Sequence, residues 1–98
     1  MIRMRIYESQ GSDHDSADRV FYELVKPVHE RHGARFLGRY CDQEGRVVVM
    51  WLYENEAACH AIQRTVAEDP VTTENAIYRR QAGLHGLKFT EYFLDSTD

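Results

Sequence analysis

The sequence predicts an α+β domain in which a four-stranded antiparallel sheet carries its helices on one face. Three observations support this fold class. Residues 2–8 alternate apolar and polar side chains with the period of two that is typical of a half-buried strand. Residues 17–28 instead repeat apolar side chains at helical spacing. Two more strand patterns, over 34–41 and 46–53, are joined by a short turn, and a fourth, over 87–94, follows near the end of the chain.

The first helix is defined by one apolar stripe and by two residues that limit it. Pro27 lies inside the stripe, and we expect it to kink the helix because its ring clashes with the preceding turn. Gly33 predicts the end of the helix, since glycine readily takes the left-handed conformation that a helix stop requires. The stripe consists of Ala17, Val20, Phe21, Leu24, Val25 and Val28.

The second and third strands are predicted to form a hairpin. The segment DQEG between them is short and rich in turn-forming residues. The third strand, VVVMWLY, is apolar on both faces and is therefore expected to be the most enclosed strand. The inward face of the second strand stays open between two alternating sets: Phe36, Gly38 and Tyr40, or Leu37, Arg39 and Cys41.

The second helical region is predicted to break in two. Asn55 is a candidate N-cap for a helix that places Ala58, Ile62 and Val66 on one face. The pair Asp69-Pro70 has the residue types preferred at the N-cap and first position of a third helix, which we expect to end near Gly83.

The resulting order is β-α-β-β-α-β, the ferredoxin-like arrangement, and we expect residues 1–98 to form a single domain. The first and third strands then lie in the centre of the sheet, and the fourth lies beside the first. We expect the helices to cover the face of Ile2, Met4 and Ile6. The opposite face would be too apolar for water, so a second copy of the chain is expected to pack on it as a homodimer. That face carries Tyr7, Val47, Val49, Trp51 and Tyr53.

Composition excludes several classes of partner. The net charge of −4, without a basic cluster, argues against nucleic acid. No apolar run approaches the roughly 20 residues of a membrane-spanning helix. The beginning of the chain does not resemble a secretion signal, so we expect a cytoplasmic protein. Cys41 and Cys59 are accordingly expected to be reduced and buried.

Several segments together resemble the NIPSNAP family, which belongs to the dimeric α/β-barrel group. They are RIYES, KPVHERHGARFLGRY, VVVMWLYEN and AEDP, in order along the chain, and only the first loop departs from the family pattern by lacking a Pro-Gly turn. The resemblance implies that two ferredoxin-like sheets close into one dimeric α/β barrel. It supplies no catalytic residues, because members of this family have none that are generally agreed.

The resemblance leaves two functions open, besides a purely structural role as a dimerisation module. One is a homodimeric protein with a small-molecule cavity for an anionic or aromatic ligand and no assignable chemistry. The alternative is a cofactor-independent monooxygenase or polyketide-cyclase-like enzyme, as found among wider relatives of the fold. No cofactor is expected for either.

The polar side of the first strand supplies the main candidate site. Arg3, Arg5 and Tyr7 are expected to point away from the helices, with Glu91 of the neighbouring strand within reach. They would either form ion pairs that hold the dimer together or clamp an anionic ligand, since a guanidinium group matches a carboxylate. Candidate ligand-binding aromatic residues beside them are Tyr40, Trp51 and Tyr53.

The histidines offer weaker candidates. His14, His29 and His32 are expected on solvated surface, and no third ligand with suitable spacing supports a metal site. His60 stands near the edge of a buried helix face and is a candidate ligand-binding residue. Cyclases of this fold use a histidine–tyrosine pair for acid–base chemistry, a role that His60 or His85 would take here beside a tyrosine.

Overall fold

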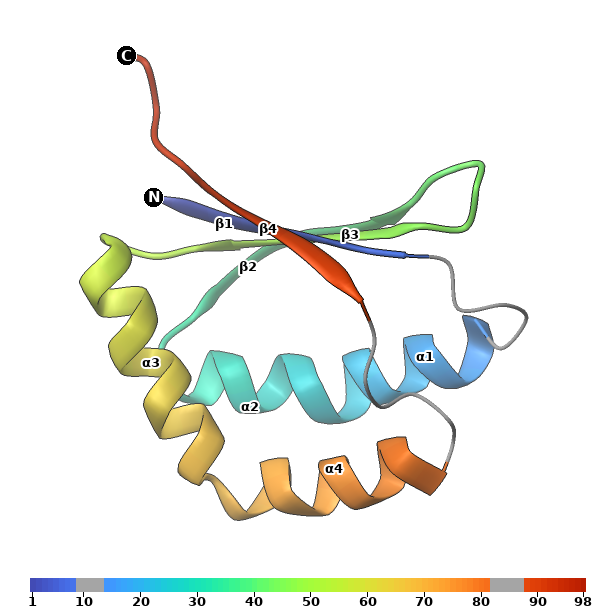
Figure 1. Cartoon of the computed structure of the whole chain (residues 1–98). Helices are drawn as coiled ribbons and strands as arrows, with labels where there is room; N and C mark the ends of the chain where they lie inside the picture. Colours follow the sequence, from blue (N-terminus) through green and yellow to red (C-terminus); the bar gives the residue numbers. More distant parts are fainter. Residues whose placement is uncertain (9–13, 82–87) are drawn as a thin grey trace.

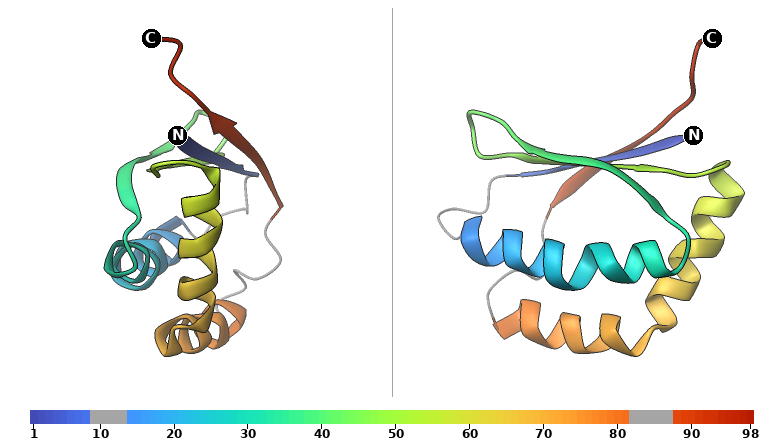
Figure 2. Two further views of the ribbon diagram at one scale, coloured as in Figure 1. Left: turned by 90° about the vertical axis from the view of Figure 1, so that its left-hand side faces the viewer. Right: turned by 180° about the vertical axis from the view of Figure 1, so that it is seen from behind.

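The computed structural model describes residues 1–8, 14–81 and 88–98 and contains a four-stranded antiparallel sheet with helices on one of its faces (Figure 1). The strands are β1 (Ile2–Tyr7), β2 (Arg35–Cys41), β3 (Val47–Leu52) and β4 (Phe89–Leu94). They are ordered β2-β3-β1-β4, so the predicted central strands and the predicted neighbours of β1 are confirmed. Figure 2 shows from two further directions that the helices all lie on the same side of the sheet.

The first helical segment has an irregular turn where a kink was predicted. It runs through α1 (His14–Val20), the π-helical η1 (Phe21–Val25) and α2 (Lys26–Arg31). The wide turn lies directly before Pro27, whose ring cannot fit against the carbonyl of a regular preceding turn. Gly33 follows with φ of 102°, which confirms its predicted role at the end of the helix.

The second helical region is broken as predicted into α3 (Glu56–Glu68) and α4 (Pro70–Gln81). The side chain of Asn55 accepts a hydrogen bond from the Ala58 amide at 2.8 Å, as an N-cap residue does. Asp69 Oδ1 accepts from the Val71 amide at 2.9 Å in the same way. The predicted end near Gly83 lies outside the described residues.

The helices cover the face of β1 opposite to the one predicted. Arg3 is paired with Trp51, Arg5 with Val49 and Tyr7 with Val47, so these side chains share one face of the sheet. Trp51 and Val49 belong to the core cluster that packs on η1, which places the two arginines on the helix side. The prediction failed because β3 is apolar on both faces and so does not define which one is covered.

The other face of the sheet is apolar and has no described residue lying over it. Its side chains are Ile2, Met4 and Ile6 from β1, Val48, Met50 and Leu52 from β3, and Tyr40, Tyr92 and Leu94 from the outer strands. Those from the outer strands are exposed and those from the central strands are half-buried. The open surface is therefore mainly aliphatic, with tyrosines on the outer strands, and it is not the face of Tyr7, Val49 and Trp51 that was expected to be open.

A bulge in β2 resolves the choice left open for that strand. Phe36 pairs with Trp51 and Gly38 with Met50, so Leu37 is an extra residue between them. Phe36 and Arg39 consequently both face the helices, whereas Gly38 and Tyr40 lie on the other face. Neither alternating set holds along the whole strand.

The two cysteines differ in their surroundings. Cys59 is buried in the core as expected, but Cys41 is exposed at the end of edge strand β2. Both are free thiols.

Candidate functional site

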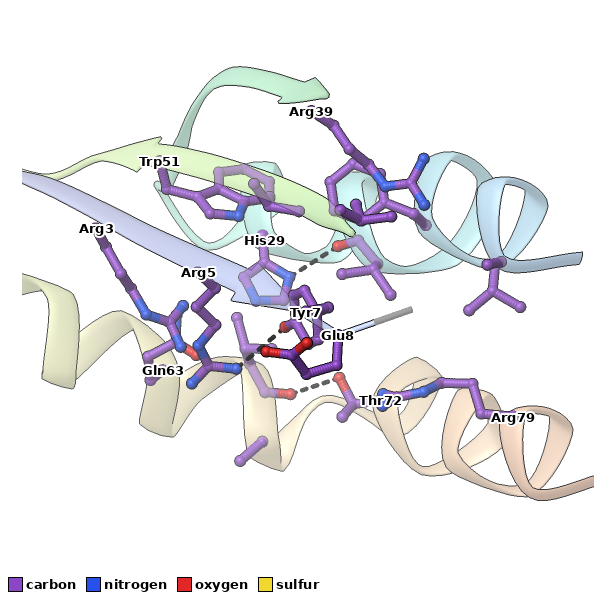
Figure 3. Close-up of a pocket in the computed structure, with 18 of the residues that line it drawn as sticks. Arg3, Arg5, Tyr7, Glu8, His29, Arg39, Trp51, Gln63, Thr72 and Arg79 are labelled. Carbon is purple, nitrogen blue, oxygen red and sulfur yellow. Dashed lines mark hydrogen bonds between the residues drawn. The ribbon is translucent and has the colours of Figure 1, made fainter. Parts of the chain in front are cut away.

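A cavity of about 360 Å³ lies between the sheet and the helices (Figure 3). Its volume falls within the range of small-ligand pockets. β1 contributes one wall through Arg3, Arg5 and Tyr7, and η1 and α2 contribute the opposite wall. The other polar lining residues are Glu8, His29, Arg39, Gln63, Thr72 and Arg79.

Arg3 and Arg5 share a single carboxylate at the cavity wall. Glu91 Oε1 accepts hydrogen bonds from Arg3 Nε at 2.5 Å and from Arg5 Nε at 3.0 Å. Arg5 Nη1 also donates to the Tyr7 hydroxyl at 3.4 Å, and the Arg5 guanidinium lies 4.1 Å from the centre of the Phe89 ring. Burial raises the pKa of Glu91, but the hydrogen bonds from the two arginines outweigh it and hold this pKa below its usual value. The three side chains Arg3, Arg5 and Glu91 together therefore carry a net charge of +1.

The remainder of the cavity wall is largely apolar. Trp51 forms its floor and packs against Phe21 and Phe36, with ring centres 6.2 and 5.2 Å away. Valine side chains extend this surface, namely Val20, Val25, Val47, Val49 and Val66. A flat apolar group fits such a surface, with the arginines on one side to bind an anion.

Most of the predicted ligand-binding residues come together around this cavity. Arg3, Arg5, Tyr7 and Trp51 line it, and Glu91 is ion-paired to the two arginines. Tyr53 is buried next to the lining, where its hydroxyl accepts from Gln63 Nε2 at 3.1 Å.

Two predicted residues lie elsewhere. Tyr40 is 58% exposed and belongs to the opposite face of the sheet, because the bulge in β2 reverses its direction. His60 is 56% exposed on α3, where its Nε2 lies 3.3 Å from Glu56 Oε1. It does not line the cavity and so cannot pair there with a tyrosine. His85 and its predicted acid–base role lie outside the described residues, as does the side chain of His14.

His29 was expected on solvated helix surface, and this was wrong. Its ring stacks on Trp51 with centres 5.1 Å apart and lines the cavity (Figure 3). Burial lowers the pKa of His29, and the nearby charges of Arg3 and Arg5 lower it further. The sequence contained a signal for this position, because His29 continues the four-residue spacing of Phe21 and Val25.

His32 was also expected on solvated surface, but it is ion-paired at the junction of three helices. Its Nε2 lies 2.7 Å from Asp69 Oδ2, and Arg31 Nη2 donates to the same oxygen at 2.7 Å. These contacts hold the pKa of the Asp69 carboxyl well below its usual range. They fasten the end of α2 to the turn between α3 and α4, next to Val66 and Thr72, which line the cavity.

The described part of the chain has neither a cluster of metal ligands nor a helix suited to span a membrane. Within it, no three His, Cys, Asp or Glu side chains are grouped so that they could hold a metal ion. No helix there has the length and apolar character needed to cross a membrane.

Comparison with known proteins agrees with the fold and identifies the family. At 17% identity, the chain is similar to an uncharacterised NIPSNAP domain protein from Burkholderia xenovorans, with a TM-score of 0.75 over 99% of this chain and 96% of that one. A NIPSNAP family protein from Agrobacterium tumefaciens is 16% identical, with a TM-score of 0.76 over 98% and 93% of the two chains. A candidate antibiotic biosynthesis monooxygenase from Deinococcus radiodurans is also 16% identical, with a TM-score of 0.64 over 99% and 94%. A search of curated protein sequences gives no match. The NIPSNAP family model matches residues 2–88, and the chain therefore belongs to the NIPSNAP family.

Proposed function

We propose that this protein binds a small carboxylic acid with an aromatic or otherwise apolar body in the cavity between its sheet and helices. The observation that carries the proposal is the pair of guanidinium groups, Arg3 and Arg5, on one wall of an otherwise largely apolar cavity. A buried positive charge without a full set of counter-ions favours an anionic ligand.

The charges around the cavity support an anion rather than a cation. Four arginine side chains line it, and Arg39 is ion-paired with Asp18 as Arg3 and Arg5 are with Glu91. Glu8 also lines the cavity. The four arginines are thus accompanied by three carboxylates, namely Glu8, Asp18 and Glu91. A bound carboxylate would complete the neutralisation.

Calorimetric titration with benzoate tests this function. Arg5→Gln removes the guanidinium group that is half-buried at the cavity wall, and we expect benzoate to bind roughly 10- to 100-fold more weakly, the loss of one charge-assisted hydrogen bond. Arg64→Gln, at an exposed position on α3 away from the cavity, serves as the matched control and should leave the affinity unchanged. Equal affinity of both variants, or no binding by the unmodified protein, would refute the proposal.

We further propose that residues 1–98 assemble as one dimeric α/β-barrel homodimer through the open face of the sheet. This apolar face has its aliphatic centre on β1 and β3 and tyrosines on both outer strands, and burying it against a second copy would stabilise a chain too small for a large core. Met50→Arg, at the centre of the face, should convert a particle of twice 11.5 kDa into a monomer in sedimentation experiments. Ala61→Arg, on the exposed side of α3, should not.

A cytoplasmic location fits the thiols. Cys41 and Cys59 are both free, one exposed and one buried. An exposed unpaired thiol is typical of a reducing compartment. We propose the cytoplasm on this ground, and microscopy of the tagged protein in its native cell tests it.

A further inference from the structure

The hydrogen bonding of His29 defines its tautomer. Nδ1 of the ring lies 2.8 Å from the Val25 carbonyl oxygen, a contact drawn in Figure 3. Because a carbonyl oxygen only accepts hydrogen bonds, Nδ1 must carry the proton and donate it. In the neutral ring, Nε2 is then an unprotonated nitrogen with a lone pair.

The surroundings of His29 keep the ring neutral. Burial is the main influence that lowers its pKa, and although the Val25 carbonyl opposes it, Arg3 and Arg5 on β1 and His32 on the same helical segment add to the lowering. Trp51 on β3 covers one face of the ring and brings no charge. At neutral pH, Nε2 is therefore a hydrogen-bond acceptor, and none of the residues in 1–8, 14–81 and 88–98 donates to it.

The arginine pair and His29 Nε2 require different hydrogen-bonding groups on a ligand. Arg3 and Arg5 donate hydrogen bonds and bind an anion. Nε2 of His29 accepts a hydrogen bond. A carboxylate cannot donate one, because a carboxylate and an unprotonated imidazole nitrogen are both acceptors. A ligand that pairs with both sides of the cavity must carry a donor as well as an anion.

We propose that His29 recognises a hydroxyl group on the bound acid, so that the natural ligand class is a hydroxylated aromatic or unsaturated carboxylic acid. This inference rests on the proposed function, since it takes the carboxylate of the ligand to be held by Arg5. The flat apolar body of the ligand lies on the Trp51 side of the cavity, and the hydroxyl donates to Nε2. His29 is thus a specificity-determining residue.

A panel of benzoates tests the proposal by calorimetric titration. The probes are benzoate, the three hydroxybenzoate isomers and their methoxy counterparts, which keep the oxygen but remove its proton. We expect the isomer that spans Arg5 and His29 to bind about 3- to 10-fold more tightly than benzoate, the contribution of one neutral hydrogen bond. Its methoxy counterpart should lose that advantage.

Variants then assign the preference to His29. His29→Phe retains a ring over Trp51 and should abolish the preference for the hydroxylated acid over its methoxy counterpart. His29→Gln, whose amide oxygen can accept, should restore part of it. His60→Phe, an exposed histidine outside the cavity, is the matched control and should keep the full preference.

The outcomes separate this inference from the function on which it rests. If benzoate binds in an Arg5-dependent way but no hydroxybenzoate binds more tightly than its methoxy counterpart, the role of His29 is refuted and the cavity for acids stands. The same conclusion follows if His29→Phe keeps the preference. If no acid of the panel binds, the proposed function itself is refuted.

Discussion

Replacing Glu91 with Gln tests the charge balance at the cavity wall more directly than any other single change. The substitution removes one negative charge while retaining the size of the side chain. Glu91 Oε1 accepts from Arg3 at 2.5 Å and from Arg5 at 3.0 Å. The amide oxygen of Gln can still accept a hydrogen bond, so the change removes the charge and not the acceptor. Arg3 is only 5% exposed, so water screens the lost charge poorly, and the two guanidinium groups are left to repel each other.

The size of the effect follows from these two contacts. A hydrogen bond to a charged group contributes about 1.5–3 kcal/mol net and a neutral one about 1 kcal/mol, so exchanging carboxylate for amide costs roughly 1 kcal/mol per contact. The uncompensated charge of the buried Arg3 adds to this loss. Glu91 and Arg5 are 27% and 28% exposed, so solvent screening reduces the second contribution. We expect Glu91→Gln to lower the free energy of unfolding by about 2–3 kcal/mol. In a domain of this size the melting temperature then falls by roughly 10–20 °C.

The pH dependence supplies a second signature. The pKa of Glu91 is lower in the folded protein than its ordinary value of 4.5, because the arginine hydrogen bonds outweigh the effect of burial. The stability that this carboxylate contributes is therefore present above pH 4.5 and is lost as the pH falls through the lowered pKa. The difference in melting temperature between the unmodified protein and the variant should shrink over that interval.

Differential scanning calorimetry at a fixed protein concentration measures both effects, with Glu74→Gln on an exposed position of α4 as the control. Benzoate affinity should change in the opposite direction and rise in Glu91→Gln, because the arginines no longer share their charge with a carboxylate. Lower stability with tighter anion binding would separate a ligand site from a purely structural ion pair. An unchanged melting temperature and pH profile would refute the assignment of Glu91 as the partner of the buried guanidinium group.

Three further predictions concern local features. Asn55→Ala removes the N-cap of α3 and should cost about 1 kcal/mol in urea unfolding; unchanged stability would contradict its capping of Ala58. Gly33→Ala forces a side chain onto a residue with φ of 102° and should destabilise the protein by about 1–2 kcal/mol, whereas a neutral effect would disprove the strain. Trp51, the single tryptophan, should lose fluorescence as acid protonates the stacked His29, with a midpoint below pH 6.5, and His29→Phe should eliminate this transition.

The parts of the fold that were predicted correctly depend on local chemistry. Asn55 and the Asp69-Pro70 pair have the residue types that begin helices, and Gly33 has the freedom that ends one. The ion pairs of Glu91 also followed from local information, because the alternation of β4 and its place beside β1 bring this residue opposite Arg5. The helix ends needed no long-range packing to be known, whereas the Glu91 pairing also needed the strand order of the fold.

The orientation of the sheet was not predictable in this way. β1 has one aliphatic face and one face with two arginines, and we assumed that the aliphatic face must meet the helices. That rule holds for a sheet with one covered face, but here polar groups line the cavity side, and no helix of the described residues covers the aliphatic side (Figure 1). Likewise, the bulge at Leu37 reverses Tyr40, and alternation alone does not reveal an inserted residue.

The counter-ion of the arginines was the better guide to the orientation of β1. An arginine on an outward face does not need a carboxylate opposite it, because water solvates it. Arg3 and Arg5 share a face with Glu91 in the observed register, in which Arg5 is paired with Glu91, as expected when charges are to be enclosed. The group of Arg3, Arg5 and Glu91 carries a net positive charge on the cavity wall that Trp51 and His29 also line. In this chain, therefore, the polar face of the first strand marks the cavity, and its incomplete neutralisation favours an acid as the ligand.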